Sequence, residues 1–363
     1  MLGLFESKRN RFVGIDFGTS AIKVIELSYK DQKPQLENYG WFDLSGILQP
    51  VDVRQQKFSS YEDKLKAALH NLLKKLNIKN NSVHVAIPGF SGLVVLIEFP
   101  NMKNDEIDKA IEFEAHKYIP TSVEEVSISW EIINSKDESK DEQGVLKNKV
   151  DILLVAAPKK EIEKYSSLFE GTSLKMQSIE LETFSITRAL IGNEKGSFLI
   201  MDMGSRATNM ILVENGSVII NRSIDMGGND ITNTIADSLN ISKQRAEIFK
   251  KEGKDFINDK ENSILIPVLE LLGGEAKRIM TAYKEKNKAS KIDKFIISGG
   301  SCGLTGIEKY FQNMLGLEVS KGDPLKNISY DKKLASNMEK IGSSFSVAIG
   351  LALRGIEEIR SKK

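Results

Sequence analysis

The chain has 363 residues, and its 51 basic and 50 acidic side chains provide no overall positive field for binding nucleic acid. Hydrophobic residues make up 40% and charged residues 28%, which is typical of a soluble globular protein with room for two or more domains. The single cysteine, Cys302, excludes an internal disulfide. No stretch reaches the ~18 apolar residues that cross a bilayer, and the N-terminus lacks the apolar core of a secretory signal. We therefore expect a cytoplasmic protein.

Residues 12–28 predict two apolar strands joined by a polar turn. Asp16 ends the first strand and is placed to hold Mg²⁺ through water. The turn itself, Gly18, Thr19 and Ser20, offers backbone and hydroxyl donors that suit phosphate oxygens. An ordinary hairpin with a polar tip explains the same residues, so this stretch alone does not establish a phosphate site.

The chain then alternates between predicted strands and helices, and one segment resembles a compact insertion. The predicted helices occupy 61–76, 104–118 and 161–169, with Asn104 as the cap of the second. The predicted strands occupy 35–44, 83–87, 93–99, 126–133 and 150–157, and residues 174–181 lead back to the main body. Residues 134–149 are polar and charged and predict a loop. The insertion is predicted to span 83–178.

A second hairpin with the same pattern begins near residue 198. Its turn contains Asp202, Gly204, Ser205 and Thr208, and Asn215-Gly216 predicts a further two-residue turn. The pattern of strand, Asp-x-Gly-Ser/Thr turn and strand therefore occurs twice, which indicates an internal duplication.

The remaining residues predict helices at 230–239, 243–252, 265–286, 306–315 and 343–359. Strands are predicted at 292–297 and 317–319, and the first of these leads into Gly299-Gly300-Ser301. Alternating strands and helices predict an α/β fold in which helices cover mixed sheets.

The chain resembles the actin-like ATPase superfamily in the order of four features. These are the turn after Asp16, the acid Glu182, the turn after Asp202 and the Gly299-Gly300-Ser301 turn. The resemblance covers essentially the whole chain. It implies an actin-like (ribonuclease H-like) fold of two lobes with ATP and Mg²⁺ between them, the phosphates lying against backbone donors and cations.

The resemblance also implies roles for individual residues. The nucleotide contacts that it implies are Asp16, Gly18, Thr19, Ser20, Lys23, Asp202, Gly204, Ser205, Thr208, Gly228, Glu247, Lys250, Lys277, Arg278, Gly299, Gly300 and Ser301. Within this set, Glu247 and Lys250 resemble a ribose-contacting pair, and Lys277 and Arg278 resemble a stretch beside adenine. Asp16 and Asp202 would organise Mg²⁺, and Glu182 with Asp202 would be the catalytic acids.

The second turn departs from the family pattern because Arg206 stands where a small residue is common. Arg206 is compatible either with a phosphate contact or with exposure to solvent. The cradle for ATP is thus better supported than turnover, which also needs a positioned water. We expect at most a slow ATPase.

The insertion narrows the resemblance to the PilM family of type IV pilus machines. Residues 99–133 carry E-A-x-x-Y-I-P followed by a strand with Trp130, and 222–242 and 348–356 are also similar. FtsA proteins usually end in a linker and a membrane-binding helix, whereas this sequence ends at Lys363, which favours PilM. The insertion would be an SHS2-type subdomain.

The PilM resemblance implies a partner and a domain plan. The partner would be the cytoplasmic N-terminal tail of a PilN-type membrane protein, with Ile119, Pro120, Val126 and 93–99 near its groove. Other inner-membrane pilus platform and ATPase components, and a homo-oligomer, are further expected contacts, so the chain would meet the inner face of the cytoplasmic membrane only through partners. The expected lobes are 1–82 with 179–195 and 341–363, 83–178 as the partner-binding insertion, 196–225 with 290–340, and 226–289 as a helical subdomain.

Three alternatives remain open at this stage. An ATPase motor would need productive turnover, and a small-molecule kinase would need a general base, for which Glu182 is the one evident candidate. An FtsA-like filament-forming division ATPase would need a membrane anchor, and only the apolar residues at the N-terminus offer one.

Overall fold

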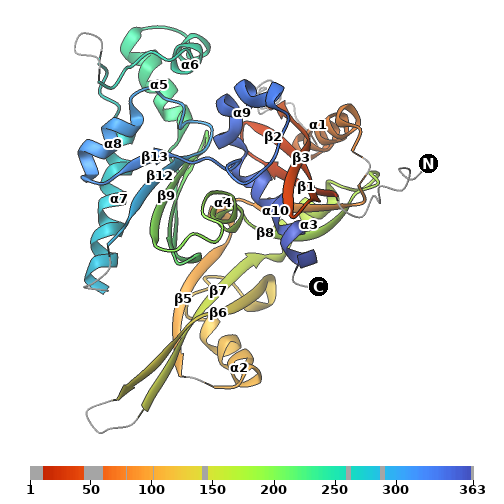
Figure 1. Ribbon diagram of the computed structural model, residues 1–363, viewed down its shortest axis with the longest axis vertical. Coiled ribbons are helices and arrows are strands. Elements are labelled where there is room, and N and C mark those ends of the chain that lie inside the picture. Colours follow the sequence, from red (N-terminus) through yellow and green to blue (C-terminus); the bar gives the residue numbers. More distant parts are fainter. Residues whose placement is uncertain are drawn as a thin grey trace.

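The computed structural model describes residues 11–44, 60–78, 80–100, 102–140, 146–258, 263–286 and 291–360. These residues form two five-stranded sheets, one three-stranded sheet and the helices that cover them (Figure 1). In this part of the chain, none of the helices has both the length and the apolar character that a bilayer crossing requires.

The two five-stranded sheets repeat one topology. The first has the order β3-β2-β1-β4-β8 and is built from β1 (Arg11–Phe17), β2 (Ala21–Lys30), β3 (Lys33–Asp43), β4 (Ser82–Ile87) and β8 (Lys175–Leu181). The second has the order β11-β10-β9-β12-β13 and is built from β9 (Ser197–Met203), β10 (Thr208–Glu214), β11 (Ser217–Ile224), β12 (Lys294–Ser298) and β13 (Val319–Lys321). In each sheet three antiparallel strands are followed by two parallel ones. The duplication predicted from the two hairpins is therefore confirmed.

Local sequence explains the turns of the second hairpin. Asn215 and Gly216 have φ values of 52° and 92°, so both occupy the left-handed region that a two-residue hairpin loop requires. The predicted turn is confirmed, and it joins β10 to β11 with Glu214 opposite Ser217.

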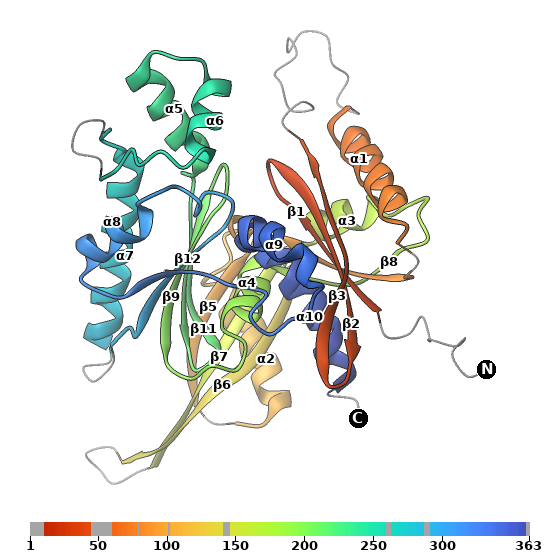
Figure 2. The ribbon, with the colours of Figure 1, turned by 45° about the horizontal axis from the view of Figure 1, so that its top comes forward.

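Helices divide the molecule into layers, which Figure 2 shows from the side. The outer face of the first sheet carries α1 (Ser60–Leu76) and α3 (Lys159–Ser167). Between the two large sheets lie α4 (Glu182–Leu190) and α10 (Ser346–Arg360). The outer face of the second sheet carries α5 (Gly228–Leu239), α6 (Lys243–Lys251), α7 (Pro267–Lys286) and α8 (Ile307–Leu315). A short helix, α9 (Ala335–Ile341), precedes α10 and was not predicted from the sequence.

Helical spacing accounts for these layers. In α1, Leu65, Leu69 and Leu72 recur on one face and are buried against the first sheet, as the sequence predicted. Brief 3₁₀ turns complete the fold at Gly89–Ser91 (η2), Val123–Glu125 (η3), Lys332–Leu334 (η4) and Gly342–Phe345 (η5).

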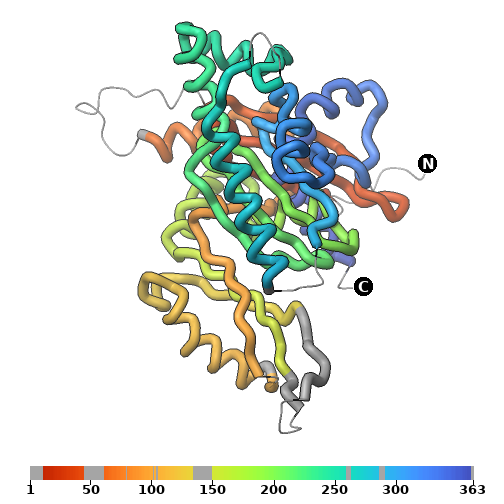
Figure 3. Tube along the Cα trace, turned by 90° about the vertical axis from the view of Figure 1, so that its left-hand side faces the viewer, coloured from red at the N-terminus to blue at the C-terminus, as the bar shows by residue number. Residues whose placement is uncertain are grey.

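The third sheet projects from the junction of the two lobes (Figure 3). It has the antiparallel order β5-β7-β6 and consists of β5 (Leu93–Pro100), β6 (Val126–Lys140) and β7 (Leu146–Pro158). One face is covered by α2 (Asn104–Ala115), whose Ile107 and Ile111 pack on Ile97 and Leu154. This sheet and its helix form an inserted domain with its own hydrophobic core.

The structure differs from the sequence prediction at three places in this region. The residues predicted as a loop, 134–149, largely continue β6 and β7, with Ser139 opposite Lys147, because a backbone ladder needs no apolar side chains. The cap of α2 is Lys103, whose N–H donates to Glu106 at 3.0 Å. The inserted sheet spans 93–158, narrower than the predicted 83–178, because β4 and β8 pair in parallel within the first sheet.

Candidate functional site

Three acidic side chains gather where the two lobes face each other. Asp16 lies near the end of β1, and Asp202 occupies the equivalent place near the end of β9. Glu182 is the first residue of α4, the helix between the two sheets. Each of Asp16 and Asp202 raises the pKa of Glu182, so the three carboxylates act on one another. The internal duplication thus places one acid from each lobe beside a third.

The first turn places a cation beside its acid. Lys23 stands opposite Asp16 in the antiparallel pair of β1 and β2, and its Nζ lies 3.2 Å from Asp16 Oδ2. Thr19 and Ser20 at the tip are exposed, and Gly18 precedes them. The tip therefore offers backbone and hydroxyl donors to a ligand, while Asp16 is held below it.

The two predicted phosphate turns meet across the lobes. Thr19 Oγ1 lies 2.6 Å from Ser205 Oγ, and these residues are 186 positions apart in the chain. The second turn is closed by a hydrogen bond from Gly204 N to Ala207 O at 3.0 Å. Both turns therefore present their small polar residues to the same place.

Glu182 is fixed by donors from both lobes. Its Oε1 accepts hydrogen bonds from Gly89 N at 2.8 Å and from Asn209 Nδ2 at 2.7 Å. Burial raises the pKa of Glu182 to about 7, and the charges of Asp202 and Asp16 add to the effect, whereas the Gly89 hydrogen bond opposes it. Burial likewise raises the pKa of Asp202 to about 6, opposed by Ser298 and Lys23.

Raised pKa values in neighbouring acids indicate a place where a positive charge is favoured. A site that favours positive charge and lies beside two turns rich in hydrogen-bond donors fits a nucleotide with Mg²⁺. Within the described residues, no group of three or more His, Cys, Asp or Glu side chains is arranged to ligate a metal directly. Mg²⁺ held through water by Asp16 and Asp202 stays a prediction.

The predicted ribose pair lies beside the second turn. Lys250 Nζ lies 2.7 Å from Glu247 Oε2 and donates to Gly228 O at 3.0 Å, while Gly228 N donates to Gly204 O at 2.9 Å. Thr232 Oγ1 donates to Glu247 and accepts from Lys250. Burial lowers the pKa of Lys250. Burial alone would raise the pKa of Glu247, but hydrogen bonds from Lys250 and Thr232 lower it. Lys250 is thus already engaged by protein groups, and Glu247 is the more accessible of the pair.

The Gly299-Gly300-Ser301 turn rests on the end of β9. A Cβ on Gly299 would stand 2.4 Å from Met203 O, and its φ is 89°, so the fold itself requires glycine there. Ser301 Oγ donates to Gly204 O at 3.4 Å, which ties this turn to the second phosphate turn. Gly300 is exposed, and a Cβ there would meet nothing within 4 Å. Its place beside the other turns leaves room for a ligand to approach the backbone.

Three predicted contact residues lie away from this cluster. Thr208 is fully buried, and its hydroxyl donates to Met226 O at 2.7 Å. Lys277 and Arg278 are exposed on α7, on the side of the second sheet turned away from the first lobe (Figure 2). Arg278 pairs there with Glu275 at 3.3 Å. A Lys-Arg pair on a helix matched the family pattern by sequence, but its helix covers the outer face.

Several residues of the cluster were missed by the sequence prediction. Asn209, Thr232 and Ser298 contact predicted residues directly, and Ser223 donates to Asn209 Oδ1 at 2.5 Å. The available signal was a polar residue within an apolar run, such as Asn209 in the strand TNMILVE. Such a residue needs a partner when buried, and Glu182 supplies it.

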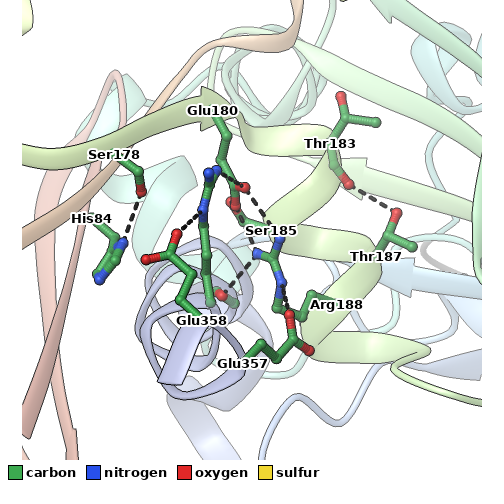
Figure 4. Close-up of polar contacts among 11 residues, drawn as sticks. His84, Ser178, Glu180, Thr183, Ser185, Thr187, Arg188, Glu357 and Glu358 are labelled. Carbon is green, nitrogen blue, oxygen red and sulfur yellow. Dashed lines mark hydrogen bonds and ion pairs between the residues drawn. The ribbon is translucent and has the colours of Figure 1, made fainter. Parts of the chain in front are cut away.

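A second polar network lies around the β8–α4 junction (Figure 4). Glu180 Oε1 lies 2.7 Å from Arg188 Nη1, and Glu180 Oε2 lies 2.6 Å from Arg354 Nη1. Ser185 Oγ also donates to Glu180, and His84 Nδ1 contacts Ser178 Oγ at 2.8 Å. Burial would raise the pKa of Glu180, but the two arginines hold it below the usual value. This network joins β8, α4 and α10.

Comparison with known proteins agrees with this geometry. A family model described as type IV pilus assembly protein PilM matches residues 14–356. A solved PilM–PilN type IV pilus biogenesis complex has a TM-score of 0.76 at 22% identity, covering 95% of this chain and 98% of that one. The ethanolamine utilization protein EutJ of Carboxydothermus hydrogenoformans has a TM-score of 0.55 at 17% identity, covering 94% and 89%.

Curated sequence relatives include the cell division protein FtsA of Bacillus subtilis, which is 20% identical over 345 residues and covers 86% of this chain and 78% of its own length. FtsA of Enterococcus hirae is 19% identical over 348 residues, with the same coverage. The predicted actin-like, two-lobe fold is confirmed by these similarities. Because the family model spans nearly all of the sequence, the chain belongs to the type IV pilus assembly protein PilM family.

Proposed function

We propose that this chain binds ATP with Mg²⁺ between its two lobes and uses the inserted domain to dock the cytoplasmic N-terminal tail of a PilN-type membrane protein. The observation that carries the nucleotide part is the meeting of the two turns at Thr19 and Ser205, together with the buried Glu182, whose pKa burial and the nearby Asp202 and Asp16 raise. The oxygens of a triphosphate would accept hydrogen bonds from the two turns, and its Mg²⁺ would supply the positive charge that the neighbouring acids favour.

The described residues divide the tasks of holding the nucleotide. The backbone and hydroxyls of Gly18, Thr19 and Ser205 would hold phosphate oxygens, and Gly300 would lie against the nucleoside. Asp16 and Asp202 would hold Mg²⁺ through water, which neutralises phosphate charge when bound. Glu247 would accept a hydrogen bond from the ribose. Glu182 accepts two hydrogen bonds that hold its carboxylate in place.

Titration calorimetry with ATP and Mg²⁺ tests the nucleotide site. We expect binding by the unmodified chain and a loss of about tenfold or more in affinity for Gly300→Val, whose side chain would occupy the space left for the ligand. Lys277→Ala is the matched control, because Lys277 lies on the outer helix α7, and its affinity should equal that of the unmodified chain. Unchanged affinity in Gly300→Val and in Asp202→Ala would overturn the proposal.

The partner part rests on the second face of the inserted sheet, opposite α2. Val155 packs against the core of the first lobe and Val94 against the cores of both lobes, both remain partly exposed, and Leu96 is partly exposed on the same face. This face leaves apolar surface at the junction between the first lobe and the inserted domain. An apolar sheet face of this kind suits an extended peptide with alternating apolar side chains. The related PilM–PilN complex supports a tail of PilN type as the occupant.

Of the groove residues expected from the sequence, the strand 93–99 is kept through Val94 and Leu96, but the point positions change. Ile119 and Val126 are buried in the core beneath α2, and of the three point predictions only Pro120 is exposed. Sequence alone cannot distinguish an apolar residue of a small core from one of a groove, because both satisfy the same pattern.

A tail peptide of a PilN-type protein, titrated with ATP present, tests the docking proposal. We expect binding that is lost in Leu96→Asp, because a carboxylate on this apolar face has no partner for its charge. Phe113→Asp is the control, since Phe113 is 72% exposed on α2 at the opposite side of the inserted sheet. Absence of binding at high micromolar peptide, or equal binding by both variants, would contradict the proposal. If the tail docks as proposed, the membrane segment of the PilN-type partner holds the chain at the inner face of the cytoplasmic membrane.

A further inference from the structure

The second phosphate turn reaches across to the entrance of the inserted domain. The guanidinium of Arg206 lies 5.9 Å from the ring centroid of Phe90, within the range of a cation–π contact. Arg206 Nε also lies 3.2 Å from Asp225 Oδ1. Phe90 is 52% exposed and belongs to η2, the turn between β4 of the first sheet and β5 of the inserted sheet. Arg206 thus joins the second lobe to a turn that belongs to neither large sheet.

The η2 turn is tightly held at its two ends. Gly89 N donates to Glu182, and a Cβ on Gly89 would stand 2.8 Å from Asn209 Oδ1. At the other end, a Cβ on Gly92 would stand 2.5 Å from the Leu181 side chain and 2.9 Å from Ala156 O of β7. Because neither end has room to absorb a displacement, a shift at Phe90 is passed on to β5.

A phosphate group competes directly for Arg206. Arg206 follows Ser205, the residue that meets Thr19 between the lobes. A guanidinium interacts more strongly with phosphate, through charge-assisted hydrogen bonds, than with an exposed aromatic ring or with an exposed ion-pair partner such as Asp225. A phosphate bound at the second turn therefore draws Arg206 away from Phe90.

We propose that Phe90 and Arg206 couple the nucleotide site to the inserted domain: Arg206 holds the η2 turn through Phe90 when phosphate is absent and releases it when phosphate is bound. Release loosens β5, one of the strands that present the apolar face proposed for the partner tail. This inference rests on the proposed nucleotide binding, because the phosphate supplies the displacement. Phe90 is a positioning residue, with no contact to the nucleotide required.

Hydrogen–deuterium exchange of peptides covering Leu93–Pro100, measured with and without ATP and Mg²⁺, tests this coupling. In the unmodified chain we expect ATP to raise the exchange rate about two- to fivefold, the factor that corresponds to one exposed cation–π contact. Phe90→Leu keeps apolar bulk but loses the ring, so its exchange without ATP should already equal that of the ATP-bound unmodified chain, with no further response. Phe90→Tyr keeps the ring and should restore the response.

Phe113→Leu is the matched control, because Phe113 is an exposed phenylalanine of the inserted domain, on α2, and it should respond as the unmodified chain does. The affinity for ATP, measured in parallel, should stay within about fivefold in Phe90→Leu. If ATP binds but leaves β5 exchange unchanged, or if Phe90→Leu responds fully, the coupling is wrong and the nucleotide site stands. If the unmodified chain binds no ATP in calorimetry, both proposals fall.

Discussion

Glu180 and Glu182 stand two residues apart at the junction of β8 and α4, yet they lie in opposite electrostatic surroundings. Glu180 contacts Arg188 and Arg354, which lower its pKa (Figure 4). Burial, with the nearby charges of Asp202 and Asp16, raises the pKa of Glu182 to about 7, and the neutral donors of Gly89 and Asn209 oppose this rise only in part. The side chains are alike, but their partners differ: Glu180 contacts two arginines, whereas Glu182 contacts a backbone N–H and an amide.

The difference separates support from function. The charge of a carboxylate that contacts two arginines is balanced within the protein, and these ion pairs hold the surrounding helices in place. A carboxylate pressed against other acids is unfavourable for the protein alone, and such a cost is found where a ligand or cation relieves it. Neutralising each glutamate should therefore change stability in opposite directions.

Removing the charge of Glu180 should have the largest effect. Glu180→Gln leaves Arg188 and Arg354 without their central partner in a buried place, and we expect a loss of about 3–5 kcal/mol in the free energy of unfolding. Urea denaturation followed by far-ultraviolet circular dichroism measures this loss.

Glu357→Gln is the control for the same arginine. Glu357 Oε2 lies 2.9 Å from Arg188 Nε, but the Glu357 side chain is 56% exposed, so its loss should cost less than about 1 kcal/mol. Equal effects of the two substitutions would contradict the view that Glu180 anchors the junction.

Neutralising Glu182 should stabilise the nucleotide-free protein at alkaline pH. The folded-state pKa of about 7 exceeds the ordinary value of 4.5, so the folded state binds more protons than the unfolded state between these values. The free energy of unfolding therefore falls as pH rises from about 4.5 to about 7 and stays reduced above it. Glu182→Gln should exceed the unmodified chain by about 2 kcal/mol at pH 8 and by little at pH 5.

Denaturation at pH 5, 6.5 and 8 without nucleotide and Mg²⁺ measures this difference. Glutamine retains an oxygen for Gly89 N and Asn209 Nδ2, so the hydrogen bonds that hold residue 182 remain available. Glu112→Gln, on the exposed face of α2, controls for the loss of one carboxylate. A difference that is the same at all three pH values would show that Glu182 carries no extra proton in the folded state.

Much of the fold was predictable because it follows from local patterns. Alternation and turn chemistry gave the strands around Asp16 and Asp202, and the repeated Asp-x-Gly turns indicated the duplication that the two sheets confirm. The PilM family was predicted from the insertion and is confirmed. These features depend on residues close to one another in the chain.

The remainder depends on pairing between distant segments. Glu180 meets Arg354 across 174 positions, and no local pattern announces this contact. Likewise, β4 and β8 joined the first sheet although their sequences fit an insertion equally well. Lys277 and Arg278 matched a family pattern by type, but whether α7 faces the cleft or solvent is decided by tertiary packing. The sequence therefore predicted the turns but not the contacts between distant segments that surround them.

The two glycines of the Gly299-Gly300 turn repeat the contrast between support and function on a smaller scale. Gly299→Ala places a Cβ 2.4 Å from Met203 O at a φ of 89°, and we expect a loss of about 1–3 kcal/mol in the free energy of unfolding. Gly300→Ala meets no protein atom within 4 Å and should change stability by less than about 1 kcal/mol. Thermal denaturation of both variants measures the difference, and equal losses would mean that Gly300 also serves the fold.

The smallest expected effect concerns the contact between the lobes at Thr19 and Ser205. Thr19→Val keeps the shape of the side chain but removes the hydroxyl that lies 2.6 Å from Ser205 Oγ. Because both residues meet at an exposed place, water can replace the lost partner, and the free energy of unfolding should fall by only about 0.5–1 kcal/mol. Phosphate oxygens, in contrast, need both hydroxyls at once, so the affinity for ATP should fall more than the stability does.

Chemical denaturation and calorimetry on the same preparation compare the two quantities. Thr121→Val, an exposed threonine after α2, controls for the substitution itself. A large loss of stability with unchanged ATP affinity would place Thr19 with Glu180, among the residues that support the fold.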